Sequence, residues 1–379
     1  MDFALSDEQQ AIVDLTRQIL TDRCTPEHLR EVEAGTDWFD RDTWNELAKA
    51  DLLGITLPES VGGGGFGYLE AALLLNEIGR AVAPLPLWST LVGAGAIAAF
   101  GSDATKQAYL SGVVAGTTIL ALGLSETAAD DRRPRTTARP DGDGWVLHGT
   151  KTIVSAFHLA DAVLVPASTE DGEVLVFAVP TGAAGVTAER QDTFNHEPQF
   201  HVVLDGVAVG ADERLGAGTD GAVVLGWILD RAVVGLCAQA AGVAEVGMRV
   251  TAGYVAERKQ FDKALGTFQA VCHRMADCYV DAGAIYLSML QAATQLDAAG
   301  PEDVVDPKLI AVAKYWASYS GSRVGHADLH LHGGISIDLD YPIHRYFLWS
   351  KQLELQLGAG TQQLARLGAV LADEPVGAI

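Results

Sequence analysis

The sequence contains few cysteines and few basic residues. Its four cysteines form no Cys-x-x-Cys pair and sit in apolar, helical-looking sequence, where buried free thiols are common, so we expect a protein of the reducing cytoplasm. Lys and Arg total 26 against 49 Asp and Glu, which gives a formal net charge of -23. Because nucleic-acid binding needs a basic surface, this balance argues against a nucleic-acid partner.

The sequence also lacks an uninterrupted apolar run of about 18 residues, the length that spans a membrane. Its N-terminus, MDFALSDEQQ, carries acids where a secretory signal carries basic residues. We therefore expect no membrane span, and we interpret the alanine-rich stretch 235–244 as buried helix. Hydrophobic residues make up 49% of the 379 residues and charged ones 20%, which is typical of folded globular proteins with two or three domains at this length.

Helical patterns occupy the first part of the chain. Ser6 and Gln9 predict a capping-box start for an amphipathic helix. The apolar face of this helix consists of Ile12, Val13, Leu15, Ile19 and Leu20. A glycine-rich break at 62–65 precedes a further apolar helix from about Tyr68 to Val82. Residues 1–120 are expected to form an N-terminal helical domain.

The middle of the chain changes to β patterns, with Asp-Gly turns at 141–144 and 171–172. The β-rich runs are Ile119–Leu124, Trp145–His148, Ala162–Ala167, Val174–Val179 and Phe200–Leu204. We expect residues 121–220 to form a central, mainly antiparallel β domain. Residues 221–379 return to helical patterns that last to about Asp373, so they are expected to form a C-terminal helical bundle, and the fold class is α+β.

The segment YVAERKQFDKALGTFQAVCHRMADCYVDA, residues 254–282, resembles the Arg-x-x-Phe-Gly … Gln … Ala-Asp pattern of the acyl-CoA dehydrogenase family. The resemblance implies that Arg258 binds the pyrophosphate of FAD, which suits a bidentate guanidinium, and that Phe261 and Gln269 flank the adenosine. In the family these groups reach the FAD of a neighbouring subunit, so a homo- or hetero-oligomer is implied, either a dimer or a tetramer. The alternative is an arginine on a solvated helix face. Asp262 departs from the family's Gly.

Two further segments resemble the part of the family's β domain that lies against the flavin ring. LALGLSE, residues 120–126, implies that Leu122, Leu124 and Ser125 offer backbone groups and a hydroxyl to the isoalloxazine, although a plain strand end explains it too. HGTKTIVSAFHLADAVLV, residues 148–165, implies a flavin contact from Ser155, while Ile153 replaces an aromatic residue. The family's Pro-Gly-x-Gly-Ser-Asp is replaced from residue 127 onwards by TAADDR, which lacks the serine that contacts acyl-CoA.

Other matches lie near both ends of the chain. GITLPESVGGGGFGYLEAALLLNEIGR, residues 54–80, is similar to the family's Pro-Glu-x-x-Gly-Gly-x-Gly loop and following helix. HLHGGISIDLDYPIHRYF, residues 330–347, implies that Gly333 and Gly334 let the backbone approach FAD, as a residue without Cβ permits. GAGTQQLARLGAVL, residues 358–371, implies cofactor contacts from Thr361 and Gln363.

The family's reaction needs a carboxylate that removes the α-proton of an acyl-CoA thioester while the β-hydrogen leaves as hydride to the flavin. At the usual position this sequence has Ala359, and at the other known position, in the long helix before Arg258, it has Ala232. The nearest acid is Asp230, turned about 200° from Ala232 round a helix. Asp230 is our candidate base; the alternative is an acid at a helix N-terminus, stabilised by the macrodipole.

These residues leave two main interpretations. The first is an FAD-dependent acyl-CoA dehydrogenase that forms a 2,3-enoyl-CoA and uses Asp230 or another acid as base. The second is a partner subunit that completes the FAD site while another chain supplies the base, as in the paired dehydrogenases of actinobacterial sterol side-chain breakdown. An oxidase or nitroalkane oxidase relative is a third possibility without a positive feature. The resemblance implies an electron-transfer flavoprotein as acceptor, and the spacing of His330, His332 and His344 predicts no metal site.

Overall fold

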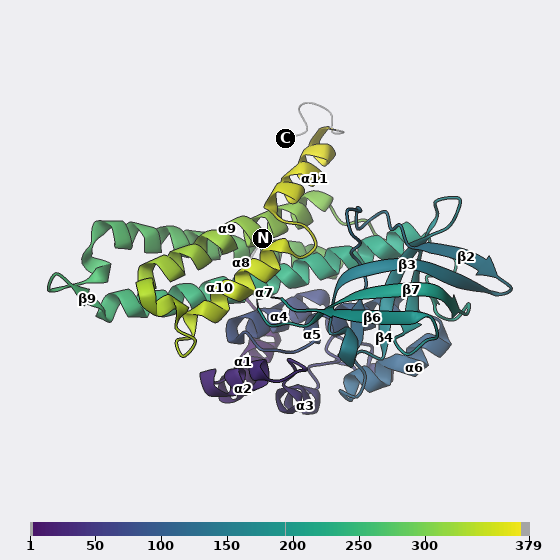
Figure 1. Cartoon of the computed structure of the whole chain (residues 1–379), viewed down its shortest axis with the longest axis horizontal. Coiled ribbons are helices and arrows are strands. Elements are labelled where there is room, and N and C mark those ends of the chain that lie inside the picture. The colour runs from purple at the N-terminus through teal and green to yellow at the C-terminus, as the bar shows by residue number, and fades with distance from the viewer. Residues whose placement is uncertain (1–2, 194, 373–379) are drawn as a thin grey trace.

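The computed structural model describes residues 3–193 and 195–372, and its order is helices, then a sheet, then helices (Figure 1). This is the expected α+β architecture. The first helices pack below the long helices that follow the sheet in the chain. Their bounds are α1 (Asp7–Arg23), α2 (Pro26–Ala34), α3 (Arg41–Lys49), the 3-10 turn η1 (Glu59–Val61), α4 (Tyr68–Ala81), α5 (Leu87–Phe100) and α6 (Asp103–Val114).

Helix α1 starts with the capping box that the sequence predicts. The Ser6 hydroxyl accepts a hydrogen bond from the Gln9 amide at 3.2 Å, and the Gln9 side chain accepts one from the Ser6 amide at 2.9 Å. Val13 and Leu20 are buried, but Leu15 is 43% exposed. The assignment of Leu15 to the apolar face is therefore wrong, because Leu15 lies about 200° round the helix from Val13, and buried Thr16 takes the inward position instead.

Helix α4 begins directly after the glycine-rich break and packs closely against α7 (Gly221–Glu257). A Cβ added to Gly79 would lie 2.1 Å from the Gln239 carbonyl oxygen, and one added to Gly242 would lie 2.2 Å from that of Asn76. Only glycine allows the two backbones to approach this closely. The contact fixes the N-terminal helices to the core of the C-terminal bundle.

A twisted sheet in the order β6-β7-β3-β2-β4-β5-β8 forms the middle of the protein, and β1 pairs with β4. Five pairs of neighbours are antiparallel, whereas β4 pairs in parallel with both β1 and β2. The strands are β1 (Leu120–Leu122), β2 (Thr137–Asp141), β3 (Gly144–Ser155), β4 (Ala162–Ser168), β5 (Val174–Pro180), β6 (Val186–Gln191), β7 (Gln199–Val209) and β8 (Arg214–Leu215), with the 3-10 turn η2 (Phe157–Leu159). All five β-rich runs of the sequence become strands.

The C-terminal part is a bundle around α7. Its other elements are β9 (Lys259–Gln260), β10 (Lys263–Ala264), η3 (Leu265–Thr267), α8 (Gln269–Ala298), α9 (Pro307–His332), η4 (Gly333–Ile337), α10 (Ile343–Leu355) and α11 (Gly360–Ala372). By length and composition α7 could cross a membrane, yet 72% of its apolar window is buried inside the protein, and residues 235–244 are all buried. Helix α7 is thus packed as a core helix. Asp373, where the helical pattern was expected to end, lies outside the described residues.

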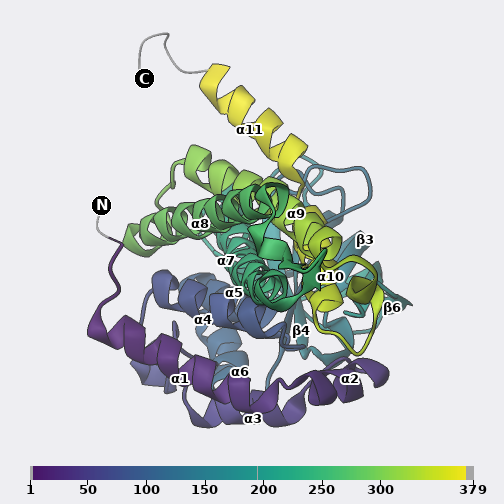
Figure 2. The ribbon, with the colours of Figure 1, turned by 90° about the vertical axis from the view of Figure 1, so that its left-hand side faces the viewer.

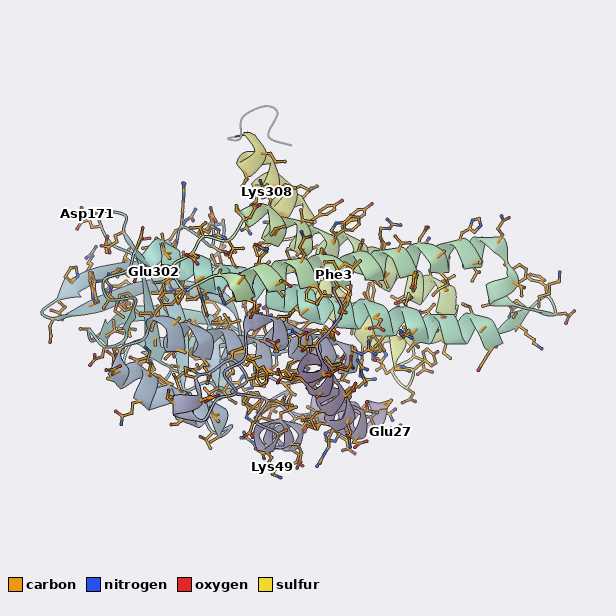
Figure 3. All side chains as sticks on the ribbon, turned by 180° about the vertical axis from the view of Figure 1, so that it is seen from behind. Phe3, Glu27, Lys49, Asp171, Glu302 and Lys308 are labelled. Atoms are coloured by element: carbon orange, nitrogen blue, oxygen red, sulfur yellow. The ribbon has the colours of Figure 1, made fainter. Side chains whose placement is uncertain are left out.

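The long helices extend well beyond the sheet at one end, and α11 rises from about the middle of the bundle (Figure 1). Viewed end-on, α11 projects away from the bundle (Figure 2). From behind, the turn between α7 and α8 lies far from the sheet, whereas Glu302, in the α8–α9 loop, lies beside it (Figure 3). There the Thr219 hydroxyl donates a hydrogen bond to the Glu302 carboxylate at 2.9 Å.

Candidate active site

The structure brings together the four residues expected beside a flavin ring. Strand β1 carries Leu122, the chain continues through Leu124 to Ser125, and Ser125 forms an isolated β-bridge with Thr152 of β3, three residues before Ser155. The Ser125 carbonyl accepts a hydrogen bond from the Thr152 amide at 2.9 Å. All four residues are buried, with exposed fractions between 3% and 9%.

The surroundings of Ser155 leave little space. The Gln199 amide donates to the Ser155 hydroxyl at 3.4 Å and to the Glu197 carboxylate at 3.3 Å. Trp88 and Trp349 help to line a cavity of only about 30 Å³ here, which has room for no more than a few water molecules. An isoalloxazine ring does not fit into this cavity.

Glu197 is an acid of this region that the sequence did not single out. Burial raises its pKa to about 7, opposed by hydrogen bonds from Gln199 and Ser155. It stands in the irregular segment before β7, so no periodicity or motif distinguished it from an ordinary loop residue.

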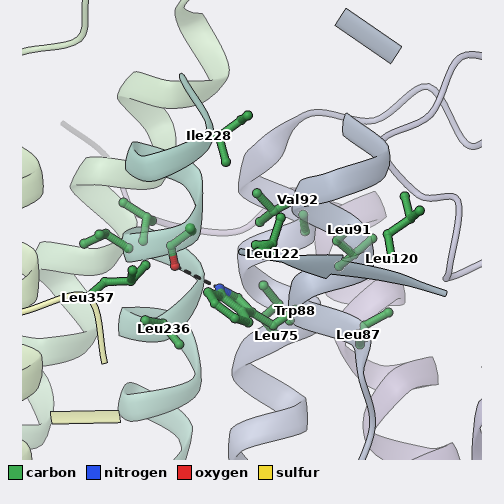
Figure 4. Packing of buried hydrophobic residues seen from close by; sticks show 14 of the residues in the cluster. Leu75, Leu87, Trp88, Leu91, Val92, Leu120, Leu122, Ile228, Leu236 and Leu357 are labelled. Carbon is green, nitrogen blue, oxygen red and sulfur yellow. Dashed lines mark hydrogen bonds between the residues drawn. The ribbon is translucent and has the colours of Figure 1, made fainter. Parts of the chain in front are cut away.

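The space beside the expected base position is filled by apolar side chains (Figure 4). Ala232 is completely buried on α7, and the Trp88 indole of α5 donates a hydrogen bond to its carbonyl oxygen at 2.9 Å. Leu122, Ile228 and Leu357 belong to the same packed cluster. The region between β1, α5, α7 and the α10–α11 loop is therefore a continuous piece of core.

Asp230 does not lie at a helix start. Helix α7 begins at Gly221, where the Asp220 carboxylate caps the Ala222 amide, and Asp230 stands more than two turns further along. The macrodipole explanation for Asp230 is therefore wrong, because that effect is confined to the first turn. The Arg132 guanidinium donates to the Asp230 carboxylate at 2.7 Å, and the carboxylate is 15% exposed. Burial raises the pKa of Asp230, and Arg132 opposes this shift.

The segment that departs from the family motif at 127–132 provides the partner of Asp230. Asp131 and Arg132 line a cavity of about 250 Å³ together with Asp230, Gln363 and Arg366. The Arg366 guanidinium of α11 lies 3.9 Å from the Asp131 carboxylate, whose pKa is raised by burial. This segment thus connects α7 and α11 through two ion pairs. One of them, between Arg132 and Asp230, involves the candidate base.

A second group of expected cofactor residues lies at the far end of the α7–α8 hairpin. Arg258 follows α7, Gln269 begins α8, and Phe261 lies at the tip between them, 87% exposed. Phe261 and Asp262 have φ values of 53° and 62°, which explains the family's glycine at 262, since Asp tolerates this left-handed conformation. An exposed guanidinium, aromatic ring and amide are thus presented together, away from Ser125 and Ser155.

Gly333 and Gly334 lie at the same end of the bundle. The His332 ring before them stacks on Tyr254, one turn before Arg258, with ring centroids 4.4 Å apart. Gly333 has φ 64°, and a Cβ added to Gly333 or Gly334 would meet nothing within 4 Å. Their backbone therefore faces open space, as expected for a position that a ligand approaches.

The last two expected residues lie at the start of α11. Thr361 and Ala359 line an open groove of about 610 Å³ between α8, α9 and α11. Gln363 points the other way: it is 2% exposed and donates to the carbonyl oxygens of Leu357 and Gly358 at 3.2 and 3.1 Å. The Gln363 amide therefore holds the loop before α11 rather than facing the groove.

No cluster of three or more His, Cys, Asp or Glu side chains suited to a metal occurs within residues 3–193 and 195–372. Two of the three histidines around the glycine turn, His332 and His344, hydrogen-bond backbone carbonyl oxygens. His332 hydrogen-bonds the Asp328 carbonyl at 2.7 Å, and His344 hydrogen-bonds the Tyr341 carbonyl at 2.7 Å.

Family models agree with this architecture. The acyl-CoA dehydrogenase N-terminal domain matches residues 6–117, and the acyl-CoA dehydrogenase C-terminal domain matches residues 219–371. The chain belongs to the acyl-CoA dehydrogenase family of flavin-dependent oxidoreductases.

Individual relatives are similar over the whole chain. The acyl-CoA dehydrogenase FadE27 of Mycobacterium tuberculosis is 40% identical, over 99% of this chain and 100% of its own length. A chain of the ChsE4-ChsE5 complex from the same organism is 39% identical with a TM-score of 0.92, over 99% of this chain and 100% of that one. A chain of the Tcur3481-Tcur3483 steroid ACAD is 42% identical with a TM-score of 0.91, over 97% and 98%.

The cofactor of the family is FAD. A glutaryl-CoA dehydrogenase from Mycobacterium smegmatis, solved in complex with FADH2, is 25% identical to this chain with a TM-score of 0.88, over 98% of this chain and 96% of that one. In the present chain the two groups of expected FAD residues differ in their fit. The exposed group around Arg258 suits a phosphate and a ring, whereas the buried group around Ser155 has no space for an isoalloxazine.

Proposed function

We propose that this chain is the partner subunit of a heteromeric acyl-CoA dehydrogenase, in which a related chain supplies the catalytic base and holds the flavin ring. The observation that carries the proposal is the closed space beside Ser155 and Ala232. The remaining cavity is about 30 Å³, and Trp88 covers the helix position where a base is expected. A catalytic chain needs this space for the ring and for the thioester.

Neither position known to carry the base holds an acid, since Ala232 is enclosed and Ala359 cannot accept a proton. Asp230 is paired with Arg132 through one carboxylate oxygen, and this ion pair opposes its protonation. Two observations favour the alternative, in which Asp230 is the catalytic base: burial raises the pKa of Asp230, and a cavity of about 250 Å³ lies beside it. Replacement of Asp230 distinguishes the two roles.

The exposed end of the α7–α8 hairpin is the part that contributes to the shared site. Arg258 binds the pyrophosphate of an FAD held mainly by the other chain, and Phe261 and Gln269 flank its adenosine. The end also exposes apolar side chains, with Phe261 87%, Ile337 80% and Leu339 69% exposed. Apolar surface gathered at one end of a folded chain indicates contact with another protein.

The assembled enzyme oxidises an acyl-CoA thioester to its 2,3-enoyl form, with FAD as the hydride acceptor. Two of the similar solved chains come from two-component assemblies, and one of these is a steroid ACAD. We therefore assign a steroid-derived acyl-CoA as substrate and an electron-transfer flavoprotein as the next electron acceptor.

The experiment is co-expression with the related chain encoded nearest to this one, followed by measurement of FAD bound per complex. Arg258→Ala is expected to weaken FAD binding by about 10- to 100-fold, because a hydrogen bond to a charged group contributes roughly 1.5–3 kcal/mol. Arg249→Ala is the matched control, since Arg249 is an exposed arginine of α7, the helix that ends just before Arg258, and it pairs with Glu245. Equal FAD content in both variants would contradict the proposed role of Arg258.

Asp230→Asn in the same complex tests the rival role directly. The partner proposal predicts that the rate of substrate-dependent flavin bleaching changes by less than about threefold, because the base belongs to the other chain. A loss of 100-fold or more, with FAD still bound, identifies Asp230 as the base and overturns the proposal, since removal of a general base typically costs about 10²–10⁴-fold.

A further inference from the structure

A separate cavity of about 310 Å³ lies between four helices: the start of α4, one face of α5, helix α7 and the end of α8. Most of its wall is apolar, formed by residues such as Leu91, Val92, Ala98 and Leu296. Cavities of this size with apolar walls and a small number of polar groups are typical of small-molecule sites.

A buried charged group lines this cavity. Arg231 of α7 lines the wall and is only 7% exposed. Its guanidinium stacks on the Trp227 ring, 3.8 Å from the ring centroid, and donates one hydrogen bond to the Leu296 carbonyl at 3.0 Å. Burial lowers the pKa of Arg231 to about 10, which leaves the side chain charged at neutral pH.

This buried charge has no carboxylate partner. Among the described residues no Asp or Glu oxygen lies within 4.0 Å of the Arg231 guanidinium. Tyr68 cannot serve either, because its hydroxyl donates to the backbone carbonyl of Arg231. Asp297 lines the exposed edge of the cavity, and Asp297 and Asp230 both favour the charged form of Arg231, but neither is within ion-pair distance of the guanidinium. A buried cation without a counter-ion is costly, since buried charges in proteins are normally paired.

We propose that this cavity binds an apolar molecule that ends in a carboxylate, with the carboxylate on Arg231 and the tail along Leu91 and Val92. A carboxylate accepts two parallel N–H bonds from one guanidinium, which Arg231 can donate while it keeps its bond to Leu296. The volume is at the lower end of the range for ligand sites, so a short-chain or medium-chain acid fits best.

The test is isothermal titration calorimetry of the full chain with octanoate, and with 1-octanol as the uncharged match. Octanoate is expected to bind more tightly than octanol. Arg231→Gln is expected to weaken octanoate binding by about 10-fold or more and to change octanol binding by less than about twofold, because only the carboxylate uses the guanidinium.

Ala98→Leu provides a second variant that leaves Arg231 in place and fills the cavity, so it is expected to weaken both ligands. It keeps the test decisive if Arg231→Gln fails to fold. Absence of octanoate binding to the wild-type chain overturns the proposal, and so does octanoate binding that Arg231→Gln or Ala98→Leu leaves unchanged. None of these readouts needs FAD or a partner chain, so failure here is separate from failure of the proposed function.

Discussion

Trp88 offers the sharpest test of whether the space beside Ala232 is packed core. Trp88 is only 8% exposed. Its indole makes apolar contacts with the core and donates a hydrogen bond to the Ala232 carbonyl oxygen at 2.9 Å. Trp88→Ala removes both and is expected to lower the free energy of unfolding by about 3–5 kcal/mol. Trp88→Phe keeps most of the apolar contact and is expected to cost about 1–2 kcal/mol, largely through the hydrogen bond.

The assay is urea denaturation of the purified full chain. Unfolding is monitored by far-ultraviolet circular dichroism, so the signal does not depend on tryptophan fluorescence. Val304→Ala serves as a control, since Val304 is 88% exposed and its truncation is expected to change stability by less than about 0.5 kcal/mol. If Trp88→Ala costs less than about 1 kcal/mol, the indole is not part of the core. The space beside Ala232 is then open enough for a ligand, and the reasoning for a partner subunit loses its main support.

Two other predictions concern the glycine turn and a buried acid. Gly333→Ala is expected to lower the free energy of unfolding by about 1–3 kcal/mol, because φ at Gly333 is 64°. Gly334→Ala is the control and is expected to change the free energy of unfolding by less than about 1 kcal/mol, because Gly334 has an ordinary φ and open space around it. Equal effects of the two variants in thermal unfolding would contradict this prediction. Burial raises the pKa of Asp328 to about 7, so the folded state binds the proton more tightly and loses stability as pH rises from about 4 to about 7. Asp328→Asn, which can still accept the Thr251 hydrogen bond, is expected to match the wild type near pH 4 and exceed its stability by as much as about 4 kcal/mol at pH 8; a constant difference between pH 4 and pH 8 would refute the assignment.

Local patterns in the sequence predicted much of the fold. The capping box at Ser6 and Gln9 and the start of α4 after the glycine-rich break depend on neighbouring residues, and the structure confirms both. Strands β2 and β6 were missed because most of their residues are exposed, so they show no alternation of apolar and polar side chains. The prediction that Leu15 lies on the apolar face of α1 was wrong, because the apolar face was drawn too wide for the helical period.

The site was less predictable, because it depends on contacts between distant segments. The sequence has alanine at both positions where the resemblance to the family predicts a base. It could not show that Trp88, 144 residues earlier, packs over Ala232, or that Arg132 forms an ion pair with Asp230. Likewise, the burial of Gln363 follows from its bonds to the loop before α11, which no spacing along the chain indicates.

The most direct test of the partner assignment compares two preparations: this chain alone, and the chain co-purified with its related partner. Both are assayed for bound FAD and for anaerobic bleaching by a panel of acyl-CoAs that includes steroid-derived thioesters. We predict that only the complex holds stoichiometric FAD and is bleached, because the lone chain has no space for the flavin ring beside Ser155. Stoichiometric FAD in the lone chain, bleached by an acyl-CoA, would show a complete enzyme and contradict the account.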